Sequence, residues 1–138
     1  MSYQMPIDRS KIREFARAVQ SRHPAHKSDD PVMPPTMLTS ARLLWEPAAE
    51  AAIPKLGFDF KRILHGEEEY VFHGPLPRAG QTLTVTTEVV DTYEKPGKRG
   101  GVMRFGVVIN EFRDESGKLV AEQRSVIVET ARPPKEQA

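Results

Sequence analysis

The sequence predicts an α+β domain in which one antiparallel sheet curves around an apolar helix. Helical patterns occupy the first half of the chain and strand patterns the second half, which is typical of α+β proteins rather than of alternating βαβ units. The predicted strands are joined by short turns, which favours antiparallel pairing. The second predicted helix is apolar on most of its sides and is therefore expected to be buried on most of its surface.

The N-terminal third combines a short extended segment, a helix and a proline-rich loop. Residues 1–7 are expected to form a strand or an arm. A helix over about 9–20 follows, because apolar residues recur there at helical spacing and Asp8 and Ser10 are good N-cap types. Four prolines exclude a regular element from residues 21–35.

A second helix is expected to begin near Thr36 and to be buried. Pro47 should kink or end it, since proline lacks the N–H that a helix interior needs. Gly57 is the expected stop after the alanine-rich continuation. The apolar anchors of this helix are predicted to be Leu38, Ala41, Leu44 and Trp45.

From about Ile63 the hydrophobic period changes to that of strands. A long antiparallel sheet and one apolar helix are most simply combined by wrapping the sheet around the helix, which is the hot-dog architecture. A helix pair on a flat sheet is the less satisfactory alternative. One domain is expected over residues 1–132, followed by a disordered tail at 133–138. The four strand segments are LHGEEEYVFHG, TLTVTTEVVDTYE, VMRFGVVINEFRD and KLVAEQRSVIVETAR.

Composition restricts the function classes. The chain has 138 residues, with 20 Lys and Arg against 19 Asp and Glu, so its net charge of +1 predicts no binding to nucleic acid. The absence of cysteine excludes disulfides, thiolate metal sites and a cysteine nucleophile. No apolar run of roughly 18 residues and no signal-peptide pattern occur. We therefore expect a cytoplasmic protein without membrane attachment.

Two histidines lie three residues apart in the proline-rich loop. His23 and His26 lack the i, i+4 spacing of a helical zinc motif, so no metal site is predicted. A histidine just before an apolar helix can act as a general acid or base. Composition alone favours the simpler interpretation, a solvated loop histidine.

The start of the second helix is a further candidate site. The free N–H groups and partial positive charge of a helix N-terminus can polarise a carbonyl oxygen, and the Thr36 N–H is the candidate donor. Alternatively, Pro34 and Pro35 merely start the helix.

Two charged segments complete the candidates. Residues 67–69 are three consecutive glutamates, whose side chains cannot converge because neighbours in a strand point to opposite faces. A solvated strand with one face toward a partner is favoured. Lys95, Lys98 and Arg99 in a turn could contact the phosphates of a pantetheine carrier, although a solvated loop is the commoner explanation.

Several segments together resemble the N-terminal dehydratase domain of the MaoC-like superfamily. They are IREFARAV, PPTML and LHGEEEYVFHGPLPRAGQTLTV, of which the last is the most specific. The resemblance spans roughly residues 5–130 and is strongest to the non-catalytic type of subunit in the mycobacterial (3R)-hydroxyacyl-carrier-protein dehydratases. It implies a hot-dog fold, a dimer with a shared sheet, an acyl-CoA or acyl-ACP substrate, hydration of a trans-2-enoyl thioester or the reverse reaction, and no cofactor or metal.

Active members of this family carry the motif G-D-x-N-P-x-H, where this chain has QSRHPAH. Pro24 and His26 match the motif, whereas the Asp position is Ser21 and the Asn position is His23. The family's glycine at the start of the central helix corresponds to Thr36. The resemblance thus implies His26 as the catalytic candidate, with Ser21, His23 and the Thr36 backbone N–H as substrate-binding groups.

The replacement of the motif's aspartate determines the expected activity. A serine hydroxyl cannot serve as the carboxylate base, and loss of a general acid–base group costs about 10²–10⁴ in rate. The chain alone should therefore be inactive or weak. As a homodimer or heterodimer component, it would line the acyl tunnel while a catalytic MaoC-like partner supplies Asp and His.

Two other functions remain open from the sequence. A hot-dog dimer that binds acyl-CoA without turning it over would also lack the aspartate. A hot-dog thioesterase would need a carboxylate to activate water, for which Asp59 or Glu46 could be proposed, although neither lies in a recognisable motif.

Overall fold

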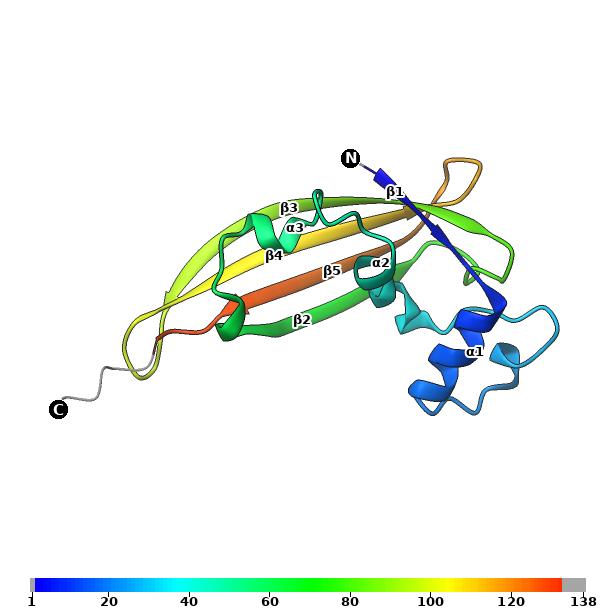
Figure 1. Ribbon diagram of the computed structural model, residues 1–138, viewed down its shortest axis with the longest axis horizontal. Coiled ribbons are helices and arrows are strands. Elements are labelled where there is room, and N and C mark those ends of the chain that lie inside the picture. Colours follow the sequence, from blue (N-terminus) through cyan, green and yellow to red (C-terminus); the bar gives the residue numbers. More distant parts are fainter. Residues whose placement is uncertain (1, 133–138) are drawn as a thin grey trace.

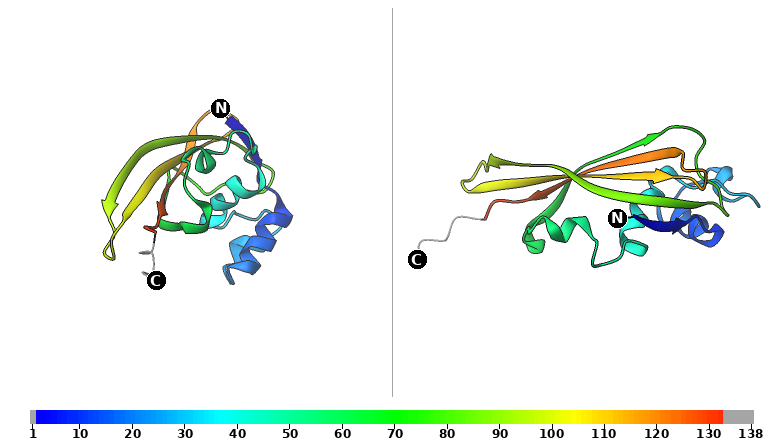
Figure 2. Two further views of the ribbon diagram at one scale, coloured as in Figure 1. Left: turned by 60° about the vertical axis from the view of Figure 1, so that its left-hand side comes forward. Right: turned by 90° about the horizontal axis from the view of Figure 1, so that it is seen from above.

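The computed structural model describes residues 2–132 and shows one curved, five-stranded antiparallel sheet. All helical segments lie on its concave side (Figures 1 and 2). The spatial order is β1-β3-β4-β5-β2, so β1 and β2 are the edge strands. The predicted tail at 133–138 lies outside the described residues. The strands are β1 (Ser2–Pro6), β2 (Ile63–Phe72), β3 (Thr82–Pro96), β4 (Val102–Arg113) and β5 (Leu119–Glu129).

The first helix forms where the sequence predicts it. α1 spans Arg9–Ala18, and the Asp8 side chain caps it by accepting a hydrogen bond from the Ser10 N–H at 2.7 Å. The helix closes at Gln20, which adopts the left-handed φ of 58° that glycine usually supplies.

The second helix, predicted to begin near Thr36 and to kink or end at Pro47, is shorter than expected, and the segment is broken into short pieces. The chain leaves helical geometry at Trp45, two residues before Pro47, and Gly57 with a φ of 67° follows the third helix as expected. The pieces are η2 (Pro35–Thr39), α2 (Ser40–Leu44), α3 (Ala52–Lys55) and η3 (Phe60–Arg62), where η denotes a 3₁₀ helix.

The anchors of this segment are only partly as predicted. Leu38 and Ala41 are fully buried, and Trp45 packs against the core. Leu44 was predicted to be buried but is 53% exposed, and its neighbour Leu43 is also exposed. Because α2 ends after five residues, its last two residues are not covered by the sheet. Leu43 and Leu44 therefore leave apolar surface exposed at the C-terminal end of this helix.

The core lies between the concave face of the sheet and the helical segments. On β3, Leu83 and Val85 are fully buried, which confirms the predicted alternation there. They meet apolar side chains from the neighbouring strands and from the N-terminal half of the chain. Fully buried members of this cluster include Met5, Ile12, Met33, Leu38, Phe112 and Ala121.

Candidate functional site

His26 is a buried loop histidine with a defined hydrogen bond. It ends the short 3₁₀ helix η1 (Pro24–His26), and only 8% of the residue is exposed. Its Nδ1 lies 2.7 Å from the Val32 carbonyl oxygen. Since a carbonyl can only accept, Nδ1 carries the hydrogen, and the neutral ring presents Nε2 as an acceptor. For His26, the interpretation as a solvated loop histidine is therefore wrong.

The Val32 carbonyl is held in place by a distant segment of the chain. Val32 forms an isolated β-bridge with Arg78. On either side of it, the Met33 N–H donates to the Pro77 carbonyl at 2.8 Å, and the Ala79 N–H donates to the Pro31 carbonyl at 3.1 Å. The orientation of the His26 ring thus depends on the loop between β2 and β3.

Ser21 and His23 have local hydrogen bonds in the same loop. The His23 Nδ1 accepts from the Ala25 N–H at 3.1 Å and so caps η1. The Ser21 hydroxyl accepts from the His23 N–H at 3.4 Å. The rings of His23 and His26 have centroids 5.6 Å apart. His23 itself is exposed and serves here as a cap.

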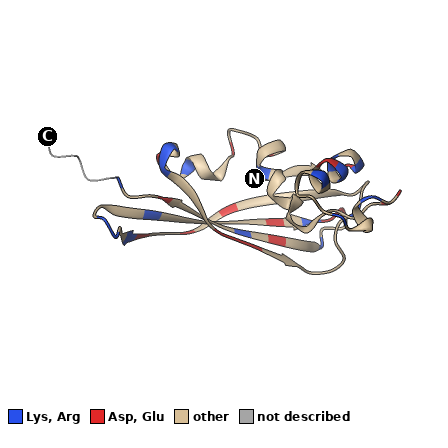
Figure 3. Ribbon diagram, turned by 90° about the horizontal axis from the view of Figure 1, so that it is seen from below, with Lys and Arg blue, Asp and Glu red and all other residues tan. Residues whose placement is uncertain are grey.

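Ser21 and His26 line one surface hollow of about 540 Å³ beside α1, which we call the His26 hollow. None of its lining residues is a carboxylate, so the imidazole has no acidic partner there. Cations instead dominate its wall, and Figure 3 shows basic residues on α1. The complete lining is Arg13, Ala16, Arg17, Gln20, Ser21, Arg22, His26 and Lys27. The arginines of α1, which recur every four residues, were the signal in the sequence for this basic wall.

Thr36 is not among the residues that line the His26 hollow. It is exposed in the first turn of η2, directly after Pro35. Near this turn lies a separate, more apolar hollow of about 210 Å³ between α1 and α2, with Phe15, Met37 and Leu44 in its wall. Within this chain, then, the structure brings Ser21 and His26 together, with His23 adjacent, but not Thr36.

The two carboxylates considered for a thioesterase lie elsewhere. Asp59 caps η3 by accepting from the Lys61 N–H at 3.1 Å, and it also pairs with Arg62; both contacts lower the pKa of its carboxyl group. Burial raises the pKa of Glu46. Neither residue lines the His26 hollow.

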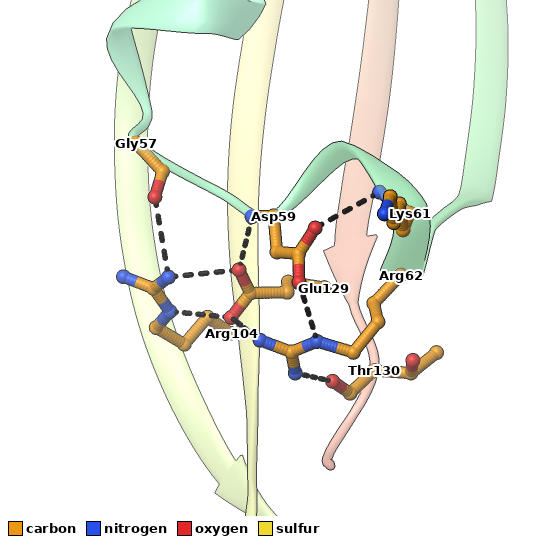
Figure 4. A network of polar contacts seen from close by, with 7 residues as sticks. All are labelled: Gly57, Asp59, Lys61, Arg62, Arg104, Glu129 and Thr130. Atoms are coloured by element: carbon orange, nitrogen blue, oxygen red, sulfur yellow. Dashed lines mark hydrogen bonds and ion pairs between the residues drawn. The ribbon is translucent and has the colours of Figure 1, made fainter.

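A closed charge network at the other end of the sheet was missed by the sequence analysis (Figure 4). The Glu129 carboxylate is 3% exposed and accepts from Arg104 Nε and Nη2, both at 2.8 Å. It also accepts from the Asp59 N–H, and Arg62 lies 3.7 Å away. Hydrogen bonds from Arg104 above all lower the pKa of Glu129 to about 2. Charged residues within the apolar runs MRFGVV and SVIVET were the available signal.

A second polar row crosses the concave face toward β2. The Thr87 hydroxyl donates to Asn110, the Asn110 amide to Gln123, and the Gln123 amide to Glu68, at 2.6, 3.0 and 3.0 Å. Asn110 and Gln123 are buried, and each is satisfied by this chain of hydrogen bonds. Glu67 pairs instead with Arg124. Glu67 and Glu68 therefore diverge, as predicted.

The carrier contact considered as an alternative for Lys95, Lys98 and Arg99 lies far from His26. The hairpin containing these residues is at the opposite end of the sheet from α1 (Figure 1). Lys95 Nζ lies 5.5 Å from the Tyr93 ring centroid and 5.4 Å from that of Phe105, so its charge is occupied by cation–π contacts.

The outer edge of β2 is flanked by exposed apolar side chains. β2 pairs only with β5, so its other edge offers unpaired backbone groups. Leu64 is 58% exposed on this strand, and Phe60 and Val71 are exposed along the same segment. Tyr70 also contacts Thr39, the last residue of η2, which places the start of α2 near the same strand.

Residues 2–132 contain neither a membrane-spanning helix nor a cluster of metal ligands. No helix in this range is long and apolar enough to cross a bilayer. No group of three or more potential His or carboxylate metal ligands occurs in the same range.

Comparison with known proteins gives consistent matches over most of the chain. The profile of a family described as "FAS1-like, dehydratase domain region" matches residues 2–123. A UPF0336 protein of Saccharopolyspora erythraea is 32% identical over 133 residues, which cover 88% of this chain and 80% of that protein.

Solved structures agree on the fold. A chain of the C-terminally truncated HadBC complex, a (3R)-hydroxyacyl-ACP dehydratase of Mycobacterium tuberculosis, superposes with a TM-score of 0.69 at 24% identity, covering 93% of this chain and 94% of that one. A MaoC-like dehydratase superposes with a TM-score of 0.75 at 24% identity, covering 94% of this chain and 41% of that one. The predicted hot-dog fold is confirmed.

Proposed function

The chain belongs to the FAS1-like dehydratase family, as the MaoC-like resemblance predicted, and we propose that it is the non-catalytic subunit of an (R)-specific enoyl-thioester hydratase or 3-hydroxyacyl-thioester dehydratase. The observation that carries the proposal is the His26 hollow. By the family resemblance, Ser21 occupies the position of the motif's aspartate, and the hollow contains no carboxylate to replace it. His26 can hold a water molecule or a substrate oxygen, but it lacks the acidic partner of an acid–base pair.

A partner subunit would supply an intact pair of Asp and His. The similar HadBC assembly is a complex, which supports a two-subunit arrangement for this chain. The free edge of β2 is the natural contact, because pairing with another strand would satisfy its backbone groups and extend the sheet. Covering Phe60, Leu64 and Val71 would also remove apolar surface from water.

The chain's own contribution would be to bind the acyl thioester. The hollow between α1 and α2 offers an apolar wall for acyl carbons. The Thr36 N–H, in the first turn after Pro35, is the proposed donor to the thioester carbonyl. The chemical step, addition of water across the enoyl double bond or its reversal, would take place at the partner's residues.

An activity assay tests the assignment. The chain alone, a MaoC-like partner with intact Asp and His, and their mixture are compared in crotonyl-CoA hydration. We expect the mixture to exceed the chain alone by about 10²–10⁴ in rate. In the mixture, His26→Ala should lower turnover by no more than about tenfold, whereas alanine at the partner's histidine should abolish it. Full activity of the chain alone that disappears in His26→Ala would refute the proposal.

The proposed contact is tested separately. Leu64→Lys places a charge on the β2 edge without disturbing the core, because this side chain is already 58% exposed. It should prevent co-elution with the partner in size-exclusion chromatography. Val102→Lys, at a half-exposed position at the start of β4, is the matched control and should leave the complex intact.

Acyl-CoA binding without turnover is the second candidate, favoured by the same missing carboxylate. Calorimetry with acyl-CoA in parallel with the activity assay distinguishes it: binding with no hydration in any partner mixture would establish this function instead.

A further inference from the structure

The wall of the His26 hollow carries four positive charges and no carboxylate. Arg13, Arg17, Arg22 and Lys27 all line it. None of the four forms an ion pair with another residue of the described range 2–132. The chain's net charge is only +1, so this local excess is a feature of the hollow and not of the protein as a whole.

The neighbouring basic surface differs in this respect. A second hollow, which shares Arg13 and Arg17 with the first, also contains Asp8 and Glu14. There Arg9 pairs with Asp29, and Lys11 pairs with Glu14. Two carboxylates therefore lie among the arginines of the second hollow, whereas the wall of the His26 hollow contains none.

Uncompensated cations around a concave surface attract anions, since the curved wall focuses their field and excludes part of the water. Arginine guanidinium groups bind phosphate oxygens through paired N–H donors. The buried His26 ring lies in the wall of the same hollow, among these cations. A volume of about 540 Å³ accommodates more than a single phosphate group.

We propose that the His26 hollow binds the phosphate groups of coenzyme A, the carrier of the acyl chain. This inference rests on the proposed function, and it assigns the carrier's phosphates to α1 and the loop after it instead of to residues 95–99. The position of the lost acid–base motif would then serve to bind phosphate. Ser21 is uncharged, so it does not repel phosphate as the motif's aspartate would, and the surrounding cations attract the phosphate groups.

Calorimetry of the full chain with coenzyme A, dephospho-coenzyme A and pantetheine tests the proposal directly. We expect affinity to fall in that order, by about tenfold for the loss of the 3′-phosphate. The Arg17→Gln/Arg22→Gln variant should bind coenzyme A at least about tenfold more weakly and should no longer distinguish it from pantetheine. The matched control is Lys98→Gln/Arg99→Gln, which removes the same charge at the other end of the sheet and should bind as wild type.

Several results would overturn the proposal: equal binding of coenzyme A and pantetheine, a loss of affinity in the control variant instead of the Arg17/Arg22 variant, or complete displacement of coenzyme A by an equal concentration of inorganic phosphate. Binding of an acidic acyl carrier protein with no binding of free coenzyme A would also contradict it.

Because the binding assay involves no turnover, it is independent of the proposed function. Binding of coenzyme A in this hollow without hydration by any partner mixture would refute the subunit role alone. Hydration with wild-type coenzyme A affinity in the Arg17/Arg22 variant would refute the phosphate site alone.

Discussion

The Glu129 network and the His26 hollow lie at opposite ends of the sheet, and both gather charged side chains. At Glu129, each carboxylate oxygen meets a donor, and the residue is almost completely buried. At His26, only the ring is buried, while the surrounding cations are exposed and have no carboxylate among them. The Glu129 network is thus buried, and its charges are paired, whereas the cations of the His26 hollow are exposed and, within the described residues, unpaired.

The difference separates structural charges from charges available for binding. Glu129 joins β5 to Arg104 of β4 and to the segment before β2, so its charge is used within the fold. A buried carboxylate without such partners would be strongly destabilising. Exposed cations tolerate being unpaired, because water solvates them, and they therefore remain free for an external anion.

Removing the Glu129 charge should have the largest effect on stability. Glu129→Gln weakens the paired hydrogen bonds from Arg104 and the one from the Asp59 N–H. Because Arg104 is partly exposed and can be resolvated, we expect a loss of about 2–3 kcal/mol in the free energy of unfolding, measured by urea denaturation. Glu69→Gln, at an exposed position of β2, should change it by less than about 0.5 kcal/mol. Equal effects of the two variants would contradict the structural role.

Acid should remove the stability that the Glu129 network contributes. The pKa of Glu129 is lowered from 4.5 to about 2 in the folded protein, so its contribution to stability is complete above about pH 4.5 and disappears as the pH falls toward 2. Asp8, Asp59 and Asp114 also have lowered pKa values and act in the same direction. The test is therefore the difference between wild type and Glu129→Gln in urea midpoint, which should shrink as the pH falls through this window. A difference independent of pH would contradict the assignment.

Local patterns were sufficient to predict much of the fold. The apolar spacing and the Asp8 cap located α1, and the period of two located four of the five strands. The second helix was predicted too long, because the alanine-rich stretch before Ala52 has high helix propensity but follows Pro47 in a loop. Tertiary packing, and not propensity, determined where these short helices begin and end.

The two charged regions needed information that local patterns lack. Glu129 meets Arg104 only through the register of β4 and β5, and the Asp59 N–H joins them from 70 residues away. His26 is buried because the distant bridge between Val32 and Arg78 fixes the carbonyl that its ring contacts. The motif located His26 in the sequence, but only the fold shows that its hollow is basic.

Removing a cation should change the free energy of unfolding in opposite directions in the two regions. Arg13 has Arg9 and Arg17 as neighbours four residues away on α1, and like charges at this spacing destabilise a helix. Arg13→Gln should therefore stabilise the protein by up to about 0.5 kcal/mol at low salt, and the gain should fade as salt screens the repulsion. Arg104→Gln leaves the buried Glu129 without its main donor and should destabilise at every salt concentration. Urea denaturation at low and high ionic strength measures both. If Arg13→Gln destabilised the chain by as much as Arg104→Gln, the cations of the His26 hollow would be structural, and the distinction between the two regions would be lost.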